Sequence, residues 1–139
     1  MGVGAYAYYR RIVEAQRGRL FDRMIKVTRL KPGADDLVKE LEAAKQETQF
    51  EKSIRGIKHA LPDSLLINGH NPLLLLHNAL SEGLHAESDE DCLSLAHDIR
   101  VVLTAVAERM AEALREDAEL QASVGRLMQP KGGEQRSVH

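Results

Sequence analysis

The sequence predicts an all-α fold, a helical bundle of four or five helices in a single domain over residues 1–128, followed by a disordered tail over residues 129–139. Three observations predict it. Apolar residues recur at steps of three, four or seven along most of the chain, the spacing of a buried helix face. Helix-starting and helix-ending residues separate these stretches, and no segment has a convincing strand pattern. With 139 residues, 4% aromatics and no Trp, we expect one core, built from aliphatic side chains.

The first predicted helix covers about 20 or more residues and ends before Lys31-Pro32-Gly33, because Pro cannot continue the hydrogen-bond ladder of a helix. Gly18 lies inside this helix and costs about 1 kcal/mol relative to Ala. Its apolar face consists of Tyr6, Tyr9, Val13, Leu20, Met24 and Val27.

Residues 35–60 predict either one bent helix or two consecutive helices, with Thr48 as a plausible break and Pro62 as the stop. Asp35 or Asp36 is expected to cap the start, where a carboxylate meets the positive end of the helix dipole. The apolar positions are Leu37, Val38, Leu41 and Ala44, then Phe50, Ile54, Ile57 and Leu61.

Asn71-Pro72 predicts the start of the next helix, because Asn is a favoured N-cap and Pro is favoured at the first helical position. Four consecutive leucines follow at positions 73–76 and cover most of the helix circumference. We therefore expect the Asn71–Leu84 helix to be buried on more than one side and to be the central helix. Its expected neighbours are Ile99, Leu103 and Val106.

Ser88 and Asp91 resemble a capping box and predict the start of the last main helix, which extends to about residue 115 or further. Its apolar stripe consists of Cys92, Leu95, Ala96, Ile99, Val102, Leu103, Val106, Met110 and Ala113. Cys92 is the only cysteine, and its place on this stripe predicts a small core residue.

Composition excludes several classes of protein. One cysteine excludes an internal disulfide framework and a Cys-based zinc site within one chain. No apolar run approaches the roughly 20 residues of a membrane span, and no signal-peptide pattern opens the sequence, so we expect a cytoplasmic location and no membrane contact. Neither a Gly-rich phosphate loop nor a metal-ligand spacing occurs, so neither a cofactor nor a metal ion is expected.

Charge is unevenly distributed along the chain. Residues 1–31 carry eight basic and two acidic side chains, whereas residues 82–119 carry eleven acidic and three basic ones. The basic first helix could contact nucleic-acid phosphates. We favour the alternative that it complements the acidic last helix, in the same chain or across a dimer, since this needs no further partner.

Histidines are the most interesting polar residues. His77, Ser81 and His85 are spaced by four residues, and together with Asn78 they can line one edge of the leucine-rich helix. His85 also follows the end of that helix, where it could bond the last carbonyl groups instead of doing chemistry.

Residues 70–103 resemble a group of uncharacterised bacterial helical domains associated with defence and restriction loci. The segments that carry the resemblance are His70–Leu73, Leu76–His85 and Ser88–Leu93, together with Gly4–Arg11 in the first helix. More remotely, the step from Leu80-Ser81 through Leu84-His85 into an acid-capped helix is similar to the HEPN superfamily, small helical bundles that are commonly dimeric.

This resemblance implies a metal-independent ribonuclease in which a His serves as acid or base on the ribose 2′-hydroxyl and an Arg steadies the phosphate. His85 takes the place of that His and Asn78 that of a neighbouring polar residue, whereas His77 stands where the family has Arg. A neutral His cannot supply the fixed charge that Arg offers a phosphate.

Two functions follow as hypotheses. The first is a non-catalytic helical interaction or regulatory domain, linked to bacterial defence or nucleic-acid processing. The alternative is a metal-independent endoribonuclease in which His85 is the general acid/base, assisted by His77, Asn78 and Arg100. In both cases wide aliphatic stripes on few helices predict a homodimer. A protein partner is compatible with the first function, and RNA with the second.

Overall fold

The computed structural model describes residues 2–83 and 88–129, and these residues form an all-α bundle, as expected. The elements are α1 (Gly2–Arg29), α2 (Asp35–Gln46), α3 (Phe50–Arg55), a 3-10 helix η1 (Asp63–Leu65), α4 (Pro72–Gly83) and α5 (Asp89–Met128). Of the tail expected over residues 129–139, all but Gln129 lies outside the described residues.

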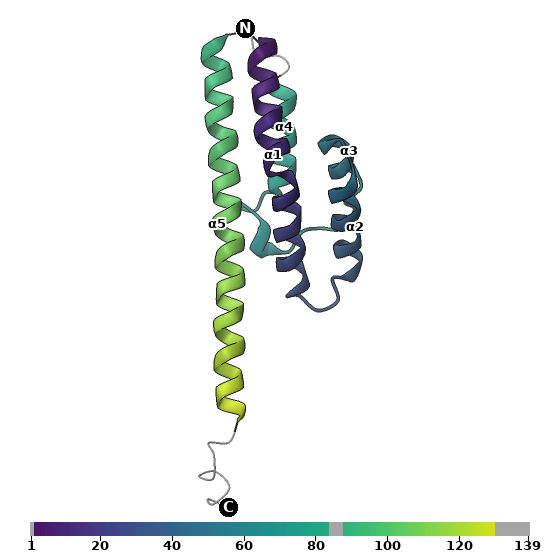
Figure 1. Cartoon of the computed structure of the whole chain (residues 1–139), viewed down its shortest axis with the longest axis vertical. Coiled ribbons are helices and arrows are strands. Elements are labelled where there is room, and N and C mark those ends of the chain that lie inside the picture. The colour runs from purple at the N-terminus through teal and green to yellow at the C-terminus, as the bar shows by residue number, and fades with distance from the viewer. Residues whose placement is uncertain (1, 84–87, 130–139) are drawn as a thin grey trace, which may run out of the picture.

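The first helix, α1, packs against α2, α4 and α5 and stands between α5 and the α2–α3 pair (Figure 1). The expectation that the leucine-rich helix is central is therefore wrong. The 12-residue α4 does contact α1, α3 and α5, but the 28-residue α1 forms the most extensive contacts of the bundle, with α2 and α5. Leu73 and Leu76 are buried, but Leu74 is 49% exposed, so one side of α4 faces solvent.

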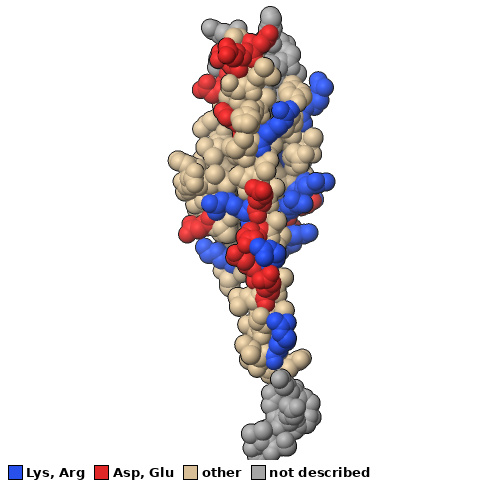
Figure 2. Space-filling view, turned by 90° about the vertical axis from the view of Figure 1, so that its left-hand side faces the viewer, with Lys and Arg blue, Asp and Glu red and all other residues tan. Residues whose placement is uncertain are grey.

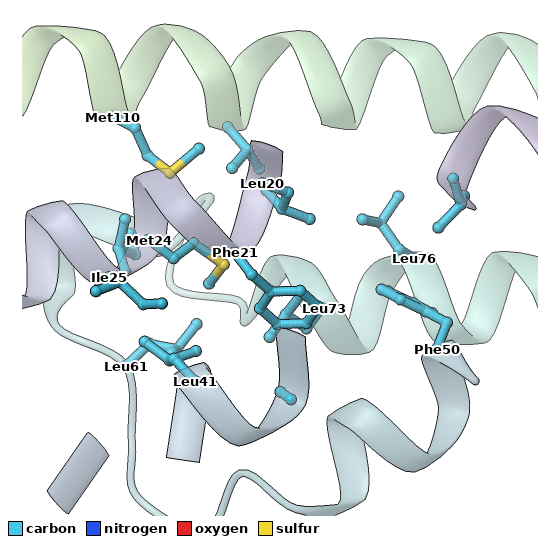
Figure 3. Packing of buried hydrophobic residues seen from close by; sticks show 14 of the residues in the cluster. Leu20, Phe21, Met24, Ile25, Leu41, Phe50, Leu61, Leu73, Leu76 and Met110 are labelled. Carbon is cyan, nitrogen blue, oxygen red and sulfur yellow. The ribbon is translucent and has the colours of Figure 1, made fainter. Parts of the chain in front are cut away.

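Residues from every helix meet in the core (Figure 3). Phe21 and Met24 of α1 lie beside Leu41 of α2, with Leu73 of α4 and Met110 of α5 close by. Most of the core is aliphatic, as expected, but the two largest fully buried side chains are the two phenylalanines, Phe21 and Phe50.

Two of the three predicted helix starts have the expected caps. The side chain of Ser88 accepts a hydrogen bond from the backbone N–H of Asp91 (3.0 Å), and the side chain of Asn71 accepts one from Leu73 (2.9 Å). The cap expected from Asp35 or Asp36 is wrong, because Ala34 is the N-cap of α2 and has no capping side chain. Both aspartates lie in the first turn instead, where their charge still meets the positive end of the dipole.

Two helices form within residues 35–60, with the break at residues 47–49 as expected for Thr48. The second of them ends at Arg55, so the expectation that helix continues to residue 60 and is stopped by Pro62 is wrong. A buried polar contact holds this break to α1. The Arg17 guanidinium (Nη2) donates to the carbonyl of Ala44 (2.9 Å) and to the hydroxyl of Ser53 (2.5 Å). The Ser53 hydroxyl in turn lies 2.8 Å from the Ala44 carbonyl oxygen and 3.1 Å from that of Gln49. One arginine therefore fixes the angle between α2 and α3.

The link from α3 to α4 contains η1 and a tight turn. Leu65 is buried, so it anchors the link to the core. Ile67 and His70 form an isolated antiparallel bridge around Asn68 and Gly69, both of which have positive φ (51° and 81°). Glycine at position 69 accommodates this conformation without a Cβ penalty.

The last helix, α5, has 40 residues and continues well past the ends of α1 and α2 (Figure 1). Its upper two thirds form part of the bundle, burying Cys92, Ala96, Ile99, Val106 and Met110. No described helix is both long enough and apolar enough to cross a membrane.

Candidate functional site

His77 lies at a pocket between α1, α3 and α4 with a volume of about 310 Å³. The imidazole is partly buried, and Ser81, one helical turn later, lines the same pocket, as the spacing predicts. The pocket also contains both signs of charge, Arg10 and Glu51. Its complete lining is Arg10, Gln49, Phe50, Glu51, His77, Leu80 and Ser81.

Two other residues of the predicted catalytic set, Asn78 and Arg100, do not line this pocket. Asn78 is exposed and does not line it. Arg100 contacts Tyr8 instead, with its guanidinium carbon 5.3 Å from the centre of the Tyr8 ring and a hydrogen bond to the hydroxyl. Tyr8 and Arg10 are two residues apart on α1, which turns them about 200° from each other, so Arg100 and His77 lie on different sides of α1. His85 lies outside the described residues.

A pocket with an arginine and a histidine can bind an anion and move a proton at neutral pH. The adjacent Glu51 opposes anion binding, and it forms an ion pair with Arg55 at 2.7 Å. Among the described residues, no group of three or more His, Cys, Asp or Glu side chains could hold a metal ion. The Arg10 and His77 side chains of this pocket can supply acid–base and electrostatic contributions.

A second histidine, His59, lies in the segment after α3, where Glu40 of α2 bonds to it and to Lys58. Glu40 accepts hydrogen bonds from the backbone N–H groups of Lys58 and His59 (both 3.0 Å), and its other oxygen lies 2.9 Å from Nδ1 of His59. These bonds, above all that from the His59 N–H, lower the pKa of Glu40 below its ordinary value. The Glu40 carboxylate therefore holds the loop after α3 against α2, which is a structural role.

The basic first helix does not pair with the acidic last helix within the described residues. The ion pairs of α1 go to α2, from Arg29 to Glu42 (3.0 Å) and from Asp22 to Lys45 (2.6 Å). On α5, Arg115 pairs with Glu112 and Glu119 of the same helix. None of these described ion pairs joins α1 to α5, so the complementarity of the two helices, in the same chain or across a dimer, stays a prediction. On the face that Figure 2 shows, acidic side chains gather at the upper end and along the middle of the molecule, with basic side chains beside the latter.

Several exposed apolar side chains lie together on the projecting end of α5, residues 118–128, which we call the stalk. Every residue of the stalk except Ser123 is exposed. Its exposed apolar side chains are Leu120 (60%), Val124 (45%), Leu127 (86%) and Met128 (78%). In Figure 2 the stalk narrows below the bundle and carries few charged side chains.

The stalk continues the stripe that α5 buries in the bundle. Steps of four and three residues alternate without interruption from Cys92 to Leu127, which is the heptad spacing of helices that pair with other helices. Only Asp117 breaks the apolar character of the stripe at its lower end. The members are Cys92, Ala96, Ile99, Leu103, Val106, Met110, Ala113, Asp117, Leu120, Val124 and Leu127.

Where the stalk leaves the bundle, α5 borders an open groove of about 670 Å³, which we call the basal groove. Its walls come from the end of α1, the segment around η1, and α5 itself. Its lining combines buried apolar side chains, such as Val27 and Leu61, with exposed acidic ones, such as Asp63 and Glu116. The lining residues are Val27, Leu30, Lys31, Ala60, Leu61, Pro62, Asp63, Ser64, Ala113, Glu116, Asp117 and Leu120.

Sequence reasoning predicted the stripe only to Ala113 and missed both the stalk and the basal groove. The signal for the stalk was present, because the heptad spacing runs on through Leu120, Val124 and Leu127. Nothing in the sequence marks the groove, because its three walls lie far apart along the chain.

Comparison with known proteins adds no relative: no protein-family model, curated protein or solved structure matches this chain.

Proposed function

We propose that this chain is a non-catalytic helical interaction module that works as a homodimer, with the stalk of α5 as its binding element. The observation that carries the proposal is the exposed heptad stripe on Leu120, Val124 and Leu127. A role in bacterial defence or nucleic-acid processing, which the sequence resemblance implies, stays a prediction.

Exposure of this stripe is costly for a chain that stays alone. Fully burying one leucine side chain contributes about 1.5–3 kcal/mol, and the stalk leaves four large apolar side chains in water. The helix of the stalk also lacks tertiary support, and Val124 and Gly125 have low helix propensity. A partner helix on the stripe would remove both costs.

The proposal is tested by sedimentation velocity at micromolar concentration. We expect a species of twice the 15.5 kDa chain mass for the wild type and a single-chain mass for the double variant Leu120→Glu, Leu127→Glu. Leu93→Glu is the matched control, because Leu93 is also an exposed leucine of α5 (72%) but lies far from the stalk. A wild type that sediments as a single chain throughout, or a double variant that dimerises like the control, contradicts the proposal.

A second candidate function is metal-independent endoribonuclease activity, favoured by the pocket that Arg10 and His77 share. One histidine would take the proton from a ribose 2′-hydroxyl, whose oxygen then attacks the phosphorus. A second would give a proton to the leaving 5′-oxygen, so that a cyclic phosphate and a free 5′-hydroxyl result. His77 and His85 are the two candidates, and Arg10 would bind the phosphate.

Cleavage of mixed RNA in the presence of a chelator tests this second candidate. The alternative requires that the wild type cleaves, that His77→Ala and His85→Ala each abolish cleavage without unfolding the protein, and that His97→Ala does not. His97 is the control because it is an exposed histidine on α5 outside the pocket. Wild-type protein that cleaves no faster than a blank removes the alternative.

A further inference from the structure

We infer that the stalk of one chain docks in the basal groove of a second copy, so that two α5 helices pair antiparallel about a two-fold axis at Leu120. This rests on the proposed homodimer and specifies its arrangement. The same exposed stripe would allow a parallel pairing of two stalks, and three observations favour the antiparallel one.

The first observation is the position of Leu120 along the stripe. Ala113 lines the groove seven residues before Leu120, and Leu127 lies in the stalk seven residues after it. Each interval is two heptad-spaced turns, or about 10.5 Å along the helix axis. A two-fold axis at Leu120 therefore places Leu127 of the second copy level with Ala113, inside the groove, and the symmetric contact forms at the same time.

The second observation is what each arrangement covers. The groove presents apolar side chains beside the α5 stripe, among them Leu30, Leu61 and Pro62. A parallel pair of stalks would cover the stripe but leave both grooves open to water. The antiparallel pair covers stalk and groove together, because each stalk occupies the groove of the other chain. A self-complementary contact of this kind is what a two-fold dimer requires.

The third observation is charge. Asp63, Glu116 and Asp117 make the groove acidic, with Lys31 as its one basic lining residue. The stalk has one basic residue, Arg126, which hydrogen-bonds only locally to the Ser123 hydroxyl (3.1 Å). In the antiparallel register Arg126 lies within about one turn of Asp117 of the second copy. A parallel register would instead place the two Asp117 carboxylates opposite each other, which is unfavourable.

Cysteine cross-linking distinguishes the two registers. In a Cys92→Ala background, Ala113→Cys and Leu127→Cys are prepared as separate single variants. Each variant carries a single cysteine, so no disulfide can form within one chain. We expect a covalent dimer on mild oxidation only when the two variants are mixed and reannealed, because position 127 meets position 113 of the other copy.

The other outcomes distinguish failure of the antiparallel arrangement from failure of the proposed homodimer. Cross-linking of Leu127→Cys with itself indicates parallel stalks and overturns the inference while the proposed homodimer stands. A non-covalent dimer whose mixed variants do not cross-link also overturns it. A wild type that is a single chain in sedimentation removes the inference together with the proposed function.

A charge reversal provides a second test that introduces no cysteine. Arg126→Glu should weaken dimerisation several-fold, and adding Asp117→Lys to the same chain should restore it, because the reversed pair again has opposite signs. Parallel stalks should not be restored by Asp117→Lys, because in that arrangement position 126 of one chain faces position 126 of the other. Failure of the second substitution to restore the dimer counts against the antiparallel register.

Discussion

Ser53 is a single buried hydroxyl on which the junction of three helices depends. It is 1% exposed and bonds to Arg17 of α1 and to carbonyls of the α2–α3 break. Its role could not be read from the sequence, because Arg17 and Ser53 are 36 residues apart and neither interrupts an apolar pattern. A buried polar pair of this kind becomes visible only when the helices are assembled.

We expect Ser53→Ala to lower the free energy of unfolding by about 1–3 kcal/mol, since it leaves the half-buried Arg17 guanidinium and the Ala44 carbonyl with fewer partners. Urea unfolding measures the change. Ser64→Ala is the control, because Ser64 is exposed on η1 and its loss should change stability by less than about 0.5 kcal/mol. Equal effects of the two substitutions would show that the Ser53 contacts contribute nothing.

The Glu40 carboxylate makes the attachment of the 58–59 segment dependent on pH. Its pKa is lowered from an ordinary value of 4.5, chiefly by the backbone N–H of His59. A lowered pKa means that the contribution to stability is complete above the ordinary value and is lost as the pH falls below it through the folded-state pKa. The attachment of residues 58–59 to Glu40 should therefore be intact at neutral pH and weaken in acid.

We expect Glu40→Gln to be less stable than the wild type at pH 6 to 7. The difference should narrow as the pH falls below about 4.5, because Glu40 is protonated first in the unfolded chain and then, at its lowered pKa, in the folded one. Denaturant unfolding at a series of pH values checks this. Glu42→Gln serves as the matched control, because Glu42 is on the same helix but pairs with Arg29 in an exposed contact. A stability gap for Glu40→Gln that is the same at every pH contradicts the assignment.

At the scale of elements, helix bounds were predictable because local chemistry sets them. Asn71-Pro72 and Ser88 begin α4 and α5, and Lys31-Pro32-Gly33 follows the end of α1, as their residue types indicate. The apolar stripes were predictable as well, since their described members are buried or partly buried in the bundle. The spacing of apolar residues predicts which face of a helix is buried.

Which helix lies in the middle was not predictable from hydrophobicity. The most apolar segment, α4, is peripheral on one side, while α1 combines length with a broad buried face. The length of the stripe on α5 could be predicted from the residue spacing. Whether other helices bury its lower end could not, because that depends on where those helices end. Likewise the residues of the predicted catalytic set were individually reasonable, yet Arg100 lies away from His77 because α1 stands between them.

Two glycines of the α1–α2 hairpin allow a paired prediction. Gly18 lies inside α1, and a Cβ added there meets nothing within 4 Å, so Gly18→Ala should stabilise the protein by about 0.5–1 kcal/mol through helix propensity. Gly33 also has open space, but its φ is +82°, so Gly33→Ala should destabilise by roughly 1–2 kcal/mol. Thermal unfolding measures both, and opposite signs are the expected result. A loss of stability in Gly18→Ala would indicate that this surface of α1 has a role that the fold does not reveal.

The whole molecule is a compact bundle with one helix extending beyond it (Figure 1). The bundle has its own core, whereas the stalk has exposed side chains and no neighbouring helix. Stability of the bundle and association through the stalk should therefore separate under truncation. This separation allows the contribution of the stalk to be measured without disturbing the fold.

We expect the thermal midpoint of the wild type to rise with protein concentration, since a dimer that dissociates on unfolding is stabilised by mass action. A chain that ends at Asp117 should keep the helical circular dichroism spectrum of the bundle and a midpoint close to that of the wild type at low concentration, because the stalk buries little against the bundle. Its midpoint should not depend on concentration.

A chain that ends at Gln129 keeps the stalk and should behave like the wild type, which assigns the effect to residues 118–128 and not to those that follow. A concentration-dependent midpoint in the chain that ends at Asp117 would place the dimer contact on the bundle instead of on the stalk.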